Sequence, residues 1–278
     1  CAVTVRTLVV HTGGIGDFLL ALPAIAKLEG AIELLGRPER LALAVEAGIA
    51  EAAHDIDATE FHTLLAEPTK SVRATLDRFD RAILWMRDSD GALERAMRNC
   101  GIGDVRVFSG LPDATWNTHT TEYYAHCLEV VSDPNFRLTF EPNGDHDVII
   151  HPGSGSREKN WPLDRFTALA QILTDRGRRV KWCLGPAELE RMPEMRALAP
   201  ALPPCSLVDL ARALSGTRLY IGNDSGITHL AGTVGCPTIA IFGPTDPRVW
   251  APRGEHVRVI HQSVWPQVDD VLESILAS

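Results

Sequence analysis

Short apolar runs alternate with longer helical segments along the chain, and the alternation is most regular in the second half. The apolar runs there have the length of strands buried on both faces and lie at 147–151, 179–184, 219–222, 238–242 and 257–260. Helical segments lie at 162–176, within 187–198, and at 207–214, 225–234 and 268–276. This regular alternation of strand and helix predicts a doubly wound parallel sheet of the α/β class.

The first half of the chain opens with the same kind of unit. An apolar run at 7–11 leads into Gly13-Gly14-Ile15-Gly16-Asp17, and a helical segment follows at 18–28. Further short strands are predicted at 33–35, 41–45 and 81–85, and helices at 69–79, 91–100 and 120–131. The first half is therefore expected to form a second Rossmann-like domain.

Residues 133–147 separate the two halves. They include two prolines, an Asn-Gly pair and several acidic residues, a composition typical of an interdomain linker. We therefore predict an N-terminal domain at 1–140 and a C-terminal domain at 141–278. Ligands of such sheets bind beyond the carboxyl ends of the strands, so the cleft between the domains is the expected site.

The composition fits two globular domains and argues against several classes of protein. The chain has 278 residues, of which 45% are hydrophobic and 23% charged, and its formal net charge is −9. The acidic excess argues against non-specific nucleic-acid binding, and no run is apolar for long enough to span a membrane. The six cysteines form no C-x-x-C pair, which favours reduced thiols in a cytoplasmic protein.

The glycine turn at 13–16 is the first candidate for chemistry. Gly14 and Gly16 allow a sharp turn and a close approach of the backbone to a ligand. Asp17, which follows them and opens the helix, has two interpretations. It is either a carboxylate that caps the helix or a general base presented to a substrate.

A loop of small and basic residues follows the strand at 147–151. It reads PGSGSREK and leads into Asn160, Trp161 and Pro162. Exposed backbone N–H groups around Gly155 and Ser156, together with the positive charge of Lys159, suit a diphosphate. The alternative is an ordinary surface loop with solvated charges.

The segment at 222–229 passes from a strand into a helix. The first N–H groups of a helix have no intrahelical partner, so Asp224, Ser225 and Gly226 mark a ready phosphate site. Asp224 or Ser225 is alternatively a simple helix cap. His229, one turn into the helix, is either a ligand contact or a satisfied core histidine.

A carboxylate also follows the strand at 179–184. Glu188 or Glu190 is placed either to bind both ribose hydroxyls of a nucleotide or to stabilise the first turn of a helix. No metal is expected, because the histidines are not clustered and the Asp-x-Asp pairs at 55–57, 88–90 and 145–147 do not follow convincing buried strands.

Four segments together carry a resemblance. They are GGIGDFLLALP near the start, then HPGSGSREKNWP, LGPAELER and YIGNDSGITHLAGTVGCPTIAIFGPTDP. In this order they resemble the heptosyltransferase family, the lipopolysaccharide-core enzymes of glycosyltransferase family nine. The resemblance covers nearly the whole chain and is densest from His151 to Pro247.

The resemblance implies a fold and an activity. The fold is GT-B, in which two Rossmann-like domains face each other across a cleft. The implied enzyme is an inverting, metal-independent glycosyltransferase without a cofactor. Its expected partners are a nucleotide-sugar donor, typically ADP-heptose, and a saccharide or glycolipid acceptor such as the lipopolysaccharide core. No nucleic acid and at most peripheral contact with the inner membrane are expected.

The resemblance also assigns roles to single residues. It implies that Asp17 is the base for the acceptor hydroxyl, that Lys159 lies beside the donor phosphates, and that Asp224 meets hydroxyls of the donor sugar. Glu188 is implied at the ribose, with Glu190 as the alternative because the match needs a one-residue gap. The residues implied at the diphosphate are Gly155, Ser156, Ser225, Gly226 and His229.

The chain departs from the family in its first half. It is shorter than usual members and is compressed between residues 28 and 41. The resemblance implies that this half supplies the acceptor surface. The basic residues available there for an anionic acceptor are Arg73, Arg78, Arg81 and Arg87. The alternatives are the same scaffold with another nucleotide-sugar donor, and a catalytically silent nucleotide-sugar binding protein. The sequence indicates neither the nucleotide base nor the oligomeric state.

Overall fold

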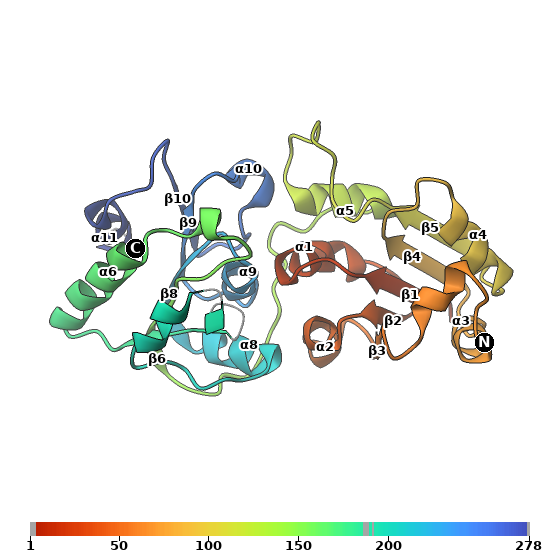
Figure 1. Ribbon diagram of the computed structural model, residues 1–278, viewed down its shortest axis with the longest axis horizontal. Helices are drawn as coiled ribbons and strands as arrows, with labels where there is room; N and C mark the ends of the chain where they lie inside the picture. Colours follow the sequence, from red (N-terminus) through yellow and green to blue (C-terminus); the bar gives the residue numbers. More distant parts are fainter. Residues whose placement is uncertain (1–3, 186–188, 191, 277–278) are drawn as a thin grey trace. The chain divides into compact units, whose positions relative to one another are not determined.

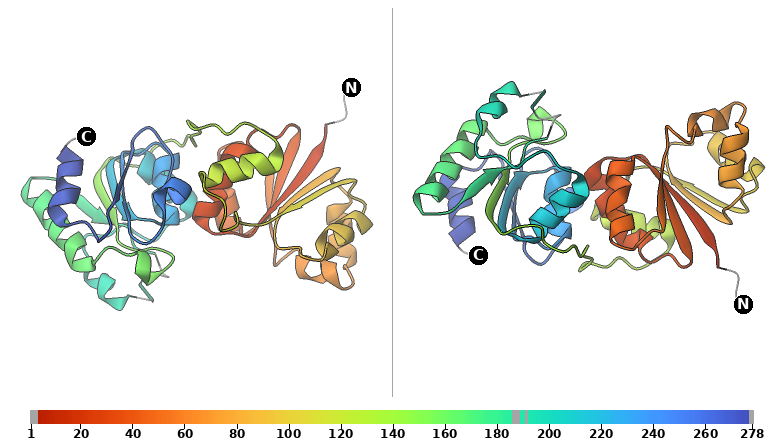
Figure 2. Two further views of the ribbon diagram at one scale, coloured as in Figure 1. Left: turned by 90° about the horizontal axis from the view of Figure 1, so that it is seen from above. Right: turned by 90° about the horizontal axis from the view of Figure 1, so that it is seen from below.

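A computed structural model describes residues 4–185, 189–190 and 192–276 of the chain (Figure 1). Internal contacts divide the chain into two compact units. Unit 1 contains the residues up to Trp116 together with Thr120–Ser132, and unit 2 contains Asn117–His119 together with the residues from Asp133 onward. In each unit, helices lie on both faces of a sheet (Figure 2), so each unit is a three-layer α/β structure.

Unit 1 is built on a parallel sheet with the order β3-β2-β1-β4-β5. Its strands are β1 Arg6–His11, β2 Ala31–Gly36, β3 Ala52–Asp55, β4 Arg81–Trp85 and β5 Asp104–Phe108. Its helices are α1 Ile15–Ile25, α2 Pro38–Glu46, α3 Lys70–Leu76, α4 Ala92–Asn99 and α5 Thr120–Leu128, and a short 3-10 helix, η1, covers Phe61–Leu65. The strands predicted at 7–11, 33–35 and 81–85 are confirmed.

The prediction of a strand at 41–45 is wrong, because these residues belong to α2. Pro38 lies in the first helical turn, where an N–H group has no partner in any case. Leu41 and Ala44 lie three residues apart on the buried face, which is helical spacing. The sequence pattern does not predict β3 or β5, because these edge strands consist largely of half-exposed residues and form no continuous apolar run.

Alternate residues of β1 face opposite layers of unit 1. Leu8 and Val10 join a cluster of buried side chains from η1, α3 and α4. His11 faces the other layer, where α1 packs against α5. The His11 ring centroid lies 5.4 Å from that of Phe18 and 6.2 Å from that of Tyr124. This aromatic layer supports the end of β1, from which the glycine turn departs.

Unit 2 is built on a parallel sheet with the order β10-β9-β8-β6-β7. Its strands are β6 His146–His151, β7 Val180–Trp182, β8 Thr217–Asn223, β9 Thr238–Phe242 and β10 Val257–His261. Its helices are α6 Leu163–Asp175, α8 Leu207–Ser215, α9 Gly226–Thr233, α10 Pro247–Trp250 and α11 Val268–Leu276, with 3-10 helices η2 Arg157–Lys159 and η3 Pro193–Ala197. The predicted strands of this half are confirmed, as are the helices at 162–176, 207–214, 225–234 and 268–276.

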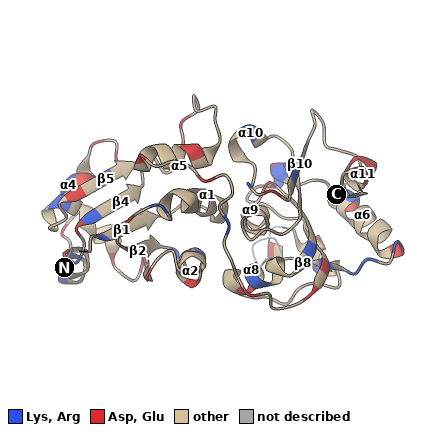
Figure 3. Ribbon diagram, turned by 180° about the vertical axis from the view of Figure 1, so that it is seen from behind, with Lys and Arg blue, Asp and Glu red and all other residues tan. Residues whose placement is uncertain are grey.

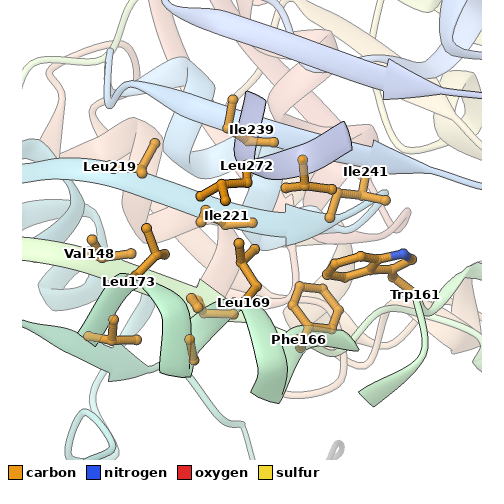
Figure 4. Close-up of a cluster of buried hydrophobic side chains, with 14 of the residues drawn as sticks. Val148, Trp161, Phe166, Leu169, Leu173, Leu219, Ile221, Ile239, Ile241 and Leu272 are labelled. Atoms are coloured by element: carbon orange, nitrogen blue, oxygen red, sulfur yellow. The ribbon is translucent and has the colours of Figure 1, made fainter. Parts of the chain in front are cut away.

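The main core of unit 2 lies between its sheet and the helices α6 and α11. Figure 4 shows apolar side chains of β6, β8 and β9, among them Ile221 and Ile241, facing those of α6 and α11. Trp161 and Phe166 close this cluster at one end, with ring centroids 4.9 Å apart in an edge-to-face arrangement. The helices α8 and α9 pack together on the opposite face.

The strand orders place a switch point in each sheet. In unit 1 the chain moves outward from β1 through β2 to β3 and then returns to place β4 on the other side of β1. In unit 2 the corresponding pair is β6 and β8. Open α/β sheets bind ligands beyond the carboxyl ends of the strands at such a point. The segments that follow β1, β4, β6 and β8 are therefore the candidates for a ligand-binding site.

Two of the helices that begin at these edges, α1 and α9, carry few charges. Asp17, in the first turn of α1, is that helix's single charged residue, and α9 contains no Asp, Glu, Lys or Arg. Most Lys, Arg, Asp and Glu residues lie in the other helices and in the loops rather than in the strands (Figure 3). Within the described part of the chain, no helix combines the length and the apolar character needed to cross a membrane.

Burial of His11 predicts a loss of stability in acid. The pKa of His11 is lowered from 6.5 to about 4, mainly because the ring is buried and to a smaller extent because of the charge of Arg40. Between these values the unfolded chain binds a proton that the folded chain does not, so stability falls as the pH drops from 6.5 toward 4, by up to about 3 kcal/mol from this residue. The variant His11→Gln should lose correspondingly less stability over this range in urea unfolding.

The exposed His256 provides the matched control for this measurement. His256→Gln should leave the difference in unfolding free energy between pH 6.5 and pH 4.5 as it is in the wild type. An equal pH dependence in His11→Gln and the wild type would show that His11 does not contribute to it.

Candidate functional site

The glycine turn of unit 1 presents Asp17 at the N-terminus of α1. Oδ2 of Asp17 accepts a hydrogen bond from the backbone N–H of Gly14 at 2.7 Å, which confirms the helix-capping interpretation. Asp17 is only half-buried, and a proton from a substrate hydroxyl needs just one carboxylate oxygen. The capping role is therefore compatible with a second role as a base.

Close packing explains why glycine begins this turn. A Cβ atom on Gly13 would lie 2.9 Å from Cε1 of His11 and 3.0 Å from Cβ of Asp17. The guanidinium of Arg40 donates a hydrogen bond to the Gly13 carbonyl, which holds the turn from the other side. The turn thus fixes Asp17 relative to the buried end of β1.

A cavity of about 350 Å³ opens at the same edge of unit 1. It is lined by η1 and by the turn that joins β4 to α4, and β4 is the strand next to β1. Of its lining side chains, Phe61, Leu64 and Leu93 are buried and apolar, whereas His62 and Arg87 are exposed. The cavity therefore combines an apolar wall with charged groups of both signs, since Asp88 and Asp90 also line it.

The structure separates the four arginines that were candidates for the acceptor. Arg78 donates to the buried carboxylate of Glu33 at 2.6 Å, and Arg81 pairs with Asp104 at 2.9 Å. Arg73 lies in α3 near the Cys100 thiol. Burial raises the pKa of this thiol, and the charge of Arg73 opposes the increase only in part. Arg87 is the one of the four that lines the cavity.

The loop after β6 meets the turn after β8 in unit 2. Nζ of Lys159, in η2, lies 2.8 Å from Oδ2 of Asp224. The side chain of Asp224 is 6% exposed and that of Lys159 is 36% exposed. The two segments predicted to bind a diphosphate are thus joined by an ion pair, and its lysine remains open to solvent on one side.

The helix α9 begins directly beside this pair. Its N-cap is Ser225, whose Oγ accepts a hydrogen bond from the N–H of Thr228 at 3.2 Å. The capping interpretation of Ser225 is therefore confirmed, and Gly226 is the first residue of the helix. The positive end of the helix dipole and the ammonium of Lys159 act in the same region.

His229 lies in the first turns of α9 and is buried. Burial lowers its pKa; the nearby Asp224 opposes this, while His119 and Lys159 add to it. The imidazole is therefore neutral at neutral pH. The sequence pattern does not predict His119 near this site. In the structure it belongs to unit 2, and its ring Nε2 lies 2.8 Å from the carbonyl oxygen of Ala251.

The remaining predicted donor residues differ in how far the structure describes them. Gly155 and Ser156 are exposed in the loop after β6, where the Ser154 hydroxyl donates to the Ser156 carbonyl at 2.6 Å. Glu188 lies outside the described residues, and Glu190 is exposed. The ribose contact stays a prediction for both glutamates.

Sequence reasoning missed Asn223, the last residue of β8. Its side chain is fully buried and hydrogen-bonds to both ends of the loop that carries Lys159. The only signal in the sequence is a polar amide at the end of an apolar strand, directly before Asp224.

Comparison with known proteins gives the family. The sequence profile of glycosyltransferase family 9 (heptosyltransferase) matches residues 112–276, which is more than half of the chain. The chain belongs to glycosyltransferase family 9. The family resemblance inferred from the four sequence segments is therefore confirmed.

The similar curated proteins include several that are named lipopolysaccharide heptosyltransferase. The chain is 35% identical to lipopolysaccharide heptosyltransferase 1 of Escherichia coli (strain K12) over 108 residues, which are 37% of this chain and 34% of that protein. It is 27% identical to lipopolysaccharide heptosyltransferase 1 of Pseudomonas aeruginosa over an alignment of 287 positions with gaps, which covers 87% of this chain and 79% of that protein. The match to the E. coli protein thus spans about a third of its length.

The fold of this family 9 member is similar to that of a solved relative. The E. coli heptosyltransferase WaaC with ADP superposes with a TM-score of 0.74 at 20% sequence identity, and 98% of this chain and 99% of that chain are covered. This likeness confirms the GT-B fold, with two Rossmann-like units.

Substitution of Gly13 tests the packing of the turn. The variant Gly13→Ala should be destabilised by about 1–3 kcal/mol, because its methyl group would press on His11 and Asp17 in a packed layer. Gly155→Ala is the control, since a Cβ there would meet nothing within 4 Å. Equal thermal midpoints for the two variants would contradict the close packing of the turn.

Proposed function

We propose that this family 9 chain transfers heptose from ADP-heptose to a saccharide of the lipopolysaccharide core, with inversion at the anomeric carbon and without a metal ion. The observation that carries the proposal is the ion pair between Lys159 and Asp224 at the N-terminus of α9. It lies at the switch point of unit 2, where Rossmann-like sheets hold phosphorylated ligands.

The proposed donor site stabilises the leaving group. Breaking the bond between the sugar and the diphosphate develops negative charge on the phosphate oxygens, and fixed positive groups lower the barrier most when they are already in position. Lys159 and the first N–H groups of α9 supply this charge locally. The relative WaaC has been solved with ADP, which supports an adenine nucleotide here.

Asp17 is the proposed base. The acceptor hydroxyl oxygen attacks the anomeric carbon, its proton passes to the Asp17 carboxylate, and the bond to the diphosphate breaks so that ADP leaves with the electron pair. One displacement of this kind inverts the anomeric centre. The hydrogen bond from Gly14 to Oδ2 holds the carboxylate in place, so that Oδ1 is the oxygen proposed to take the proton.

The acceptor is proposed to bind at the edge of unit 1 that carries Asp17. The cavity at this edge offers the guanidinium of Arg87 for an acidic group and an apolar wall for the face of a sugar ring. Because β1 and β4 are neighbours, the base and the cavity belong to the same edge of one sheet. The cytoplasmic location and the peripheral contact with the inner membrane stay predictions.

Asp17→Asn tests the role of the base. The amide cannot take the proton, so transfer from ADP-heptose to a heptose-free core acceptor should fall about 10²-fold or more. Calorimetric affinity for ADP should stay as in the wild type, because Asp17 lies in unit 1 and the proposed donor groups lie in unit 2. Transfer at the wild-type rate would exclude Asp17 as the base.

Lys159→Ala tests the stabilisation of the leaving group. Loss of the ammonium should lower kcat/KM for ADP-heptose about 10²-fold. Lys181→Ala, which removes a lysine from β7 of the same unit, is the matched control and should leave this value unchanged. Unaltered kinetics of Lys159→Ala would refute its role.

The metal-free mechanism is tested with EDTA. Rates of transfer measured with EDTA should equal those without it, and a strict requirement for a metal would refute the mechanism.

A further inference from the structure

The side chain of Asn223 is a fully buried polar group at the switch point of unit 2. Its Nδ2 donates a hydrogen bond to the carbonyl oxygen of Pro152 at 2.8 Å, and its Oδ1 accepts one from the backbone N–H of Trp161 at 2.8 Å. Pro152 and Trp161 are the two ends of the loop that contains η2. One planar amide thus closes this loop on the end of β8.

The far end of the loop is also fixed by the core. Trp161 is buried, its indole N–H donates to the carbonyl oxygen of Pro266 at 2.9 Å, and its ring packs on Phe166 (Figure 4). The backbone of Trp161 therefore cannot shift without disturbing the cluster under α6. Asn223 transfers this fixed position to the end of β8.

Lys159 lies within the closed loop, two residues before Trp161. Its ammonium reaches Asp224, the residue that follows Asn223. Residues 223 and 224 therefore hold the loop at three places: its first carbonyl, its lysine and its last N–H. The position of Lys159 relative to the N-terminus of α9 depends on this set of contacts.

The chemistry of the two hydrogen bonds requires a carboxamide. One partner is a carbonyl, which needs a donor, and the other is an N–H, which needs an acceptor. An aspartate would accept from Trp161 but would turn a carboxylate oxygen toward the Pro152 carbonyl. An alanine would leave both buried backbone groups without their partner, which is costly.

We propose that Asn223 is a positioning residue: by closing the loop between Pro152 and Trp161, it sets Lys159 at the place where the diphosphate of the donor binds. This inference rests on the proposed function, because it assumes a nucleoside diphosphate at the N-terminus of α9. Asn223 touches no substrate itself and acts through Lys159.

The test compares ADP with AMP by calorimetry for Asn223→Asp, Asn223→Ser, Lys159→Ala and the double variant of Asn223→Asp with Lys159→Ala. AMP lacks the second phosphate, so the ratio of the two affinities reports the hold on the diphosphate. Asn223→Asp should lower ADP affinity about tenfold and AMP affinity much less. In the Lys159→Ala background, Asn223→Asp should change this ratio little, because the two residues act on one contact.

Asn143→Ala provides the control for loss of a hydrogen bond from an asparagine side chain to the backbone. The Asn143 side chain also donates to a backbone carbonyl, that of Asp209 at 3.1 Å, but it lies before β6, away from the donor segments. Its removal should leave the affinities for ADP and AMP unchanged. Asn223→Ser keeps one polar group, so it supplies the same comparison if Asn223→Asp does not fold.

The outcomes separate this inference from the proposed function. A wild-type chain that binds none of ADP, GDP, UDP and dTDP would overturn both. A wild type that binds ADP, with equal losses for ADP and AMP in the Asn223 variants or effects that simply add to those of Lys159→Ala, would overturn the positioning role alone. Selective loss of ADP affinity together with non-additivity would support it.

Discussion

Parallel strands bring all their carboxyl ends to one edge of a sheet, and both units of this chain depend on that constraint. In unit 1 the edge gathers the glycine turn with Asp17 and the cavity after β4. In unit 2 it gathers the loop with Lys159 and the start of α9. Residues far apart in the sequence, such as Lys159 and Asp224, therefore come together, because the order of the strands places the ends of those strands side by side.

Electrostatics at the second edge is local. The chain carries a net charge of −9, yet a lysine and the positive end of an uncharged helix lie together in unit 2. Asp224 fixes the lysine, and the partial exposure of Lys159 leaves it able to meet a second anion. A pair whose lysine is partly exposed adds little stability, so we propose that its role is to position charge for a phosphorylated ligand.

Most strands of unit 2 could be predicted from the sequence, because continuous apolar runs such as Thr238–Phe242 form a strong pattern. The candidate site residues could be predicted as well, because they directly follow strands of this kind. The pattern gave a wrong prediction at α2, because the apolar run at 41–45 resembles a strand. Pro38, which lies in the first turn of α2, is the signal that a helix begins there. The pattern also missed β3, an edge strand with half-exposed residues. Asn223 could not be predicted, because its partners lie about 60 to 70 residues away and are backbone groups.

We propose that the switch point of unit 2 holds the diphosphate of an adenine nucleotide sugar. Calorimetric titration of the chain with ADP, GDP, UDP and dTDP tests it most directly, because all four share the diphosphate and differ in the base. ADP should bind, and it should bind more tightly than the other three nucleotides. Absence of binding by all four would contradict the phosphate site, and tighter binding of another nucleotide would contradict ADP-heptose as the donor.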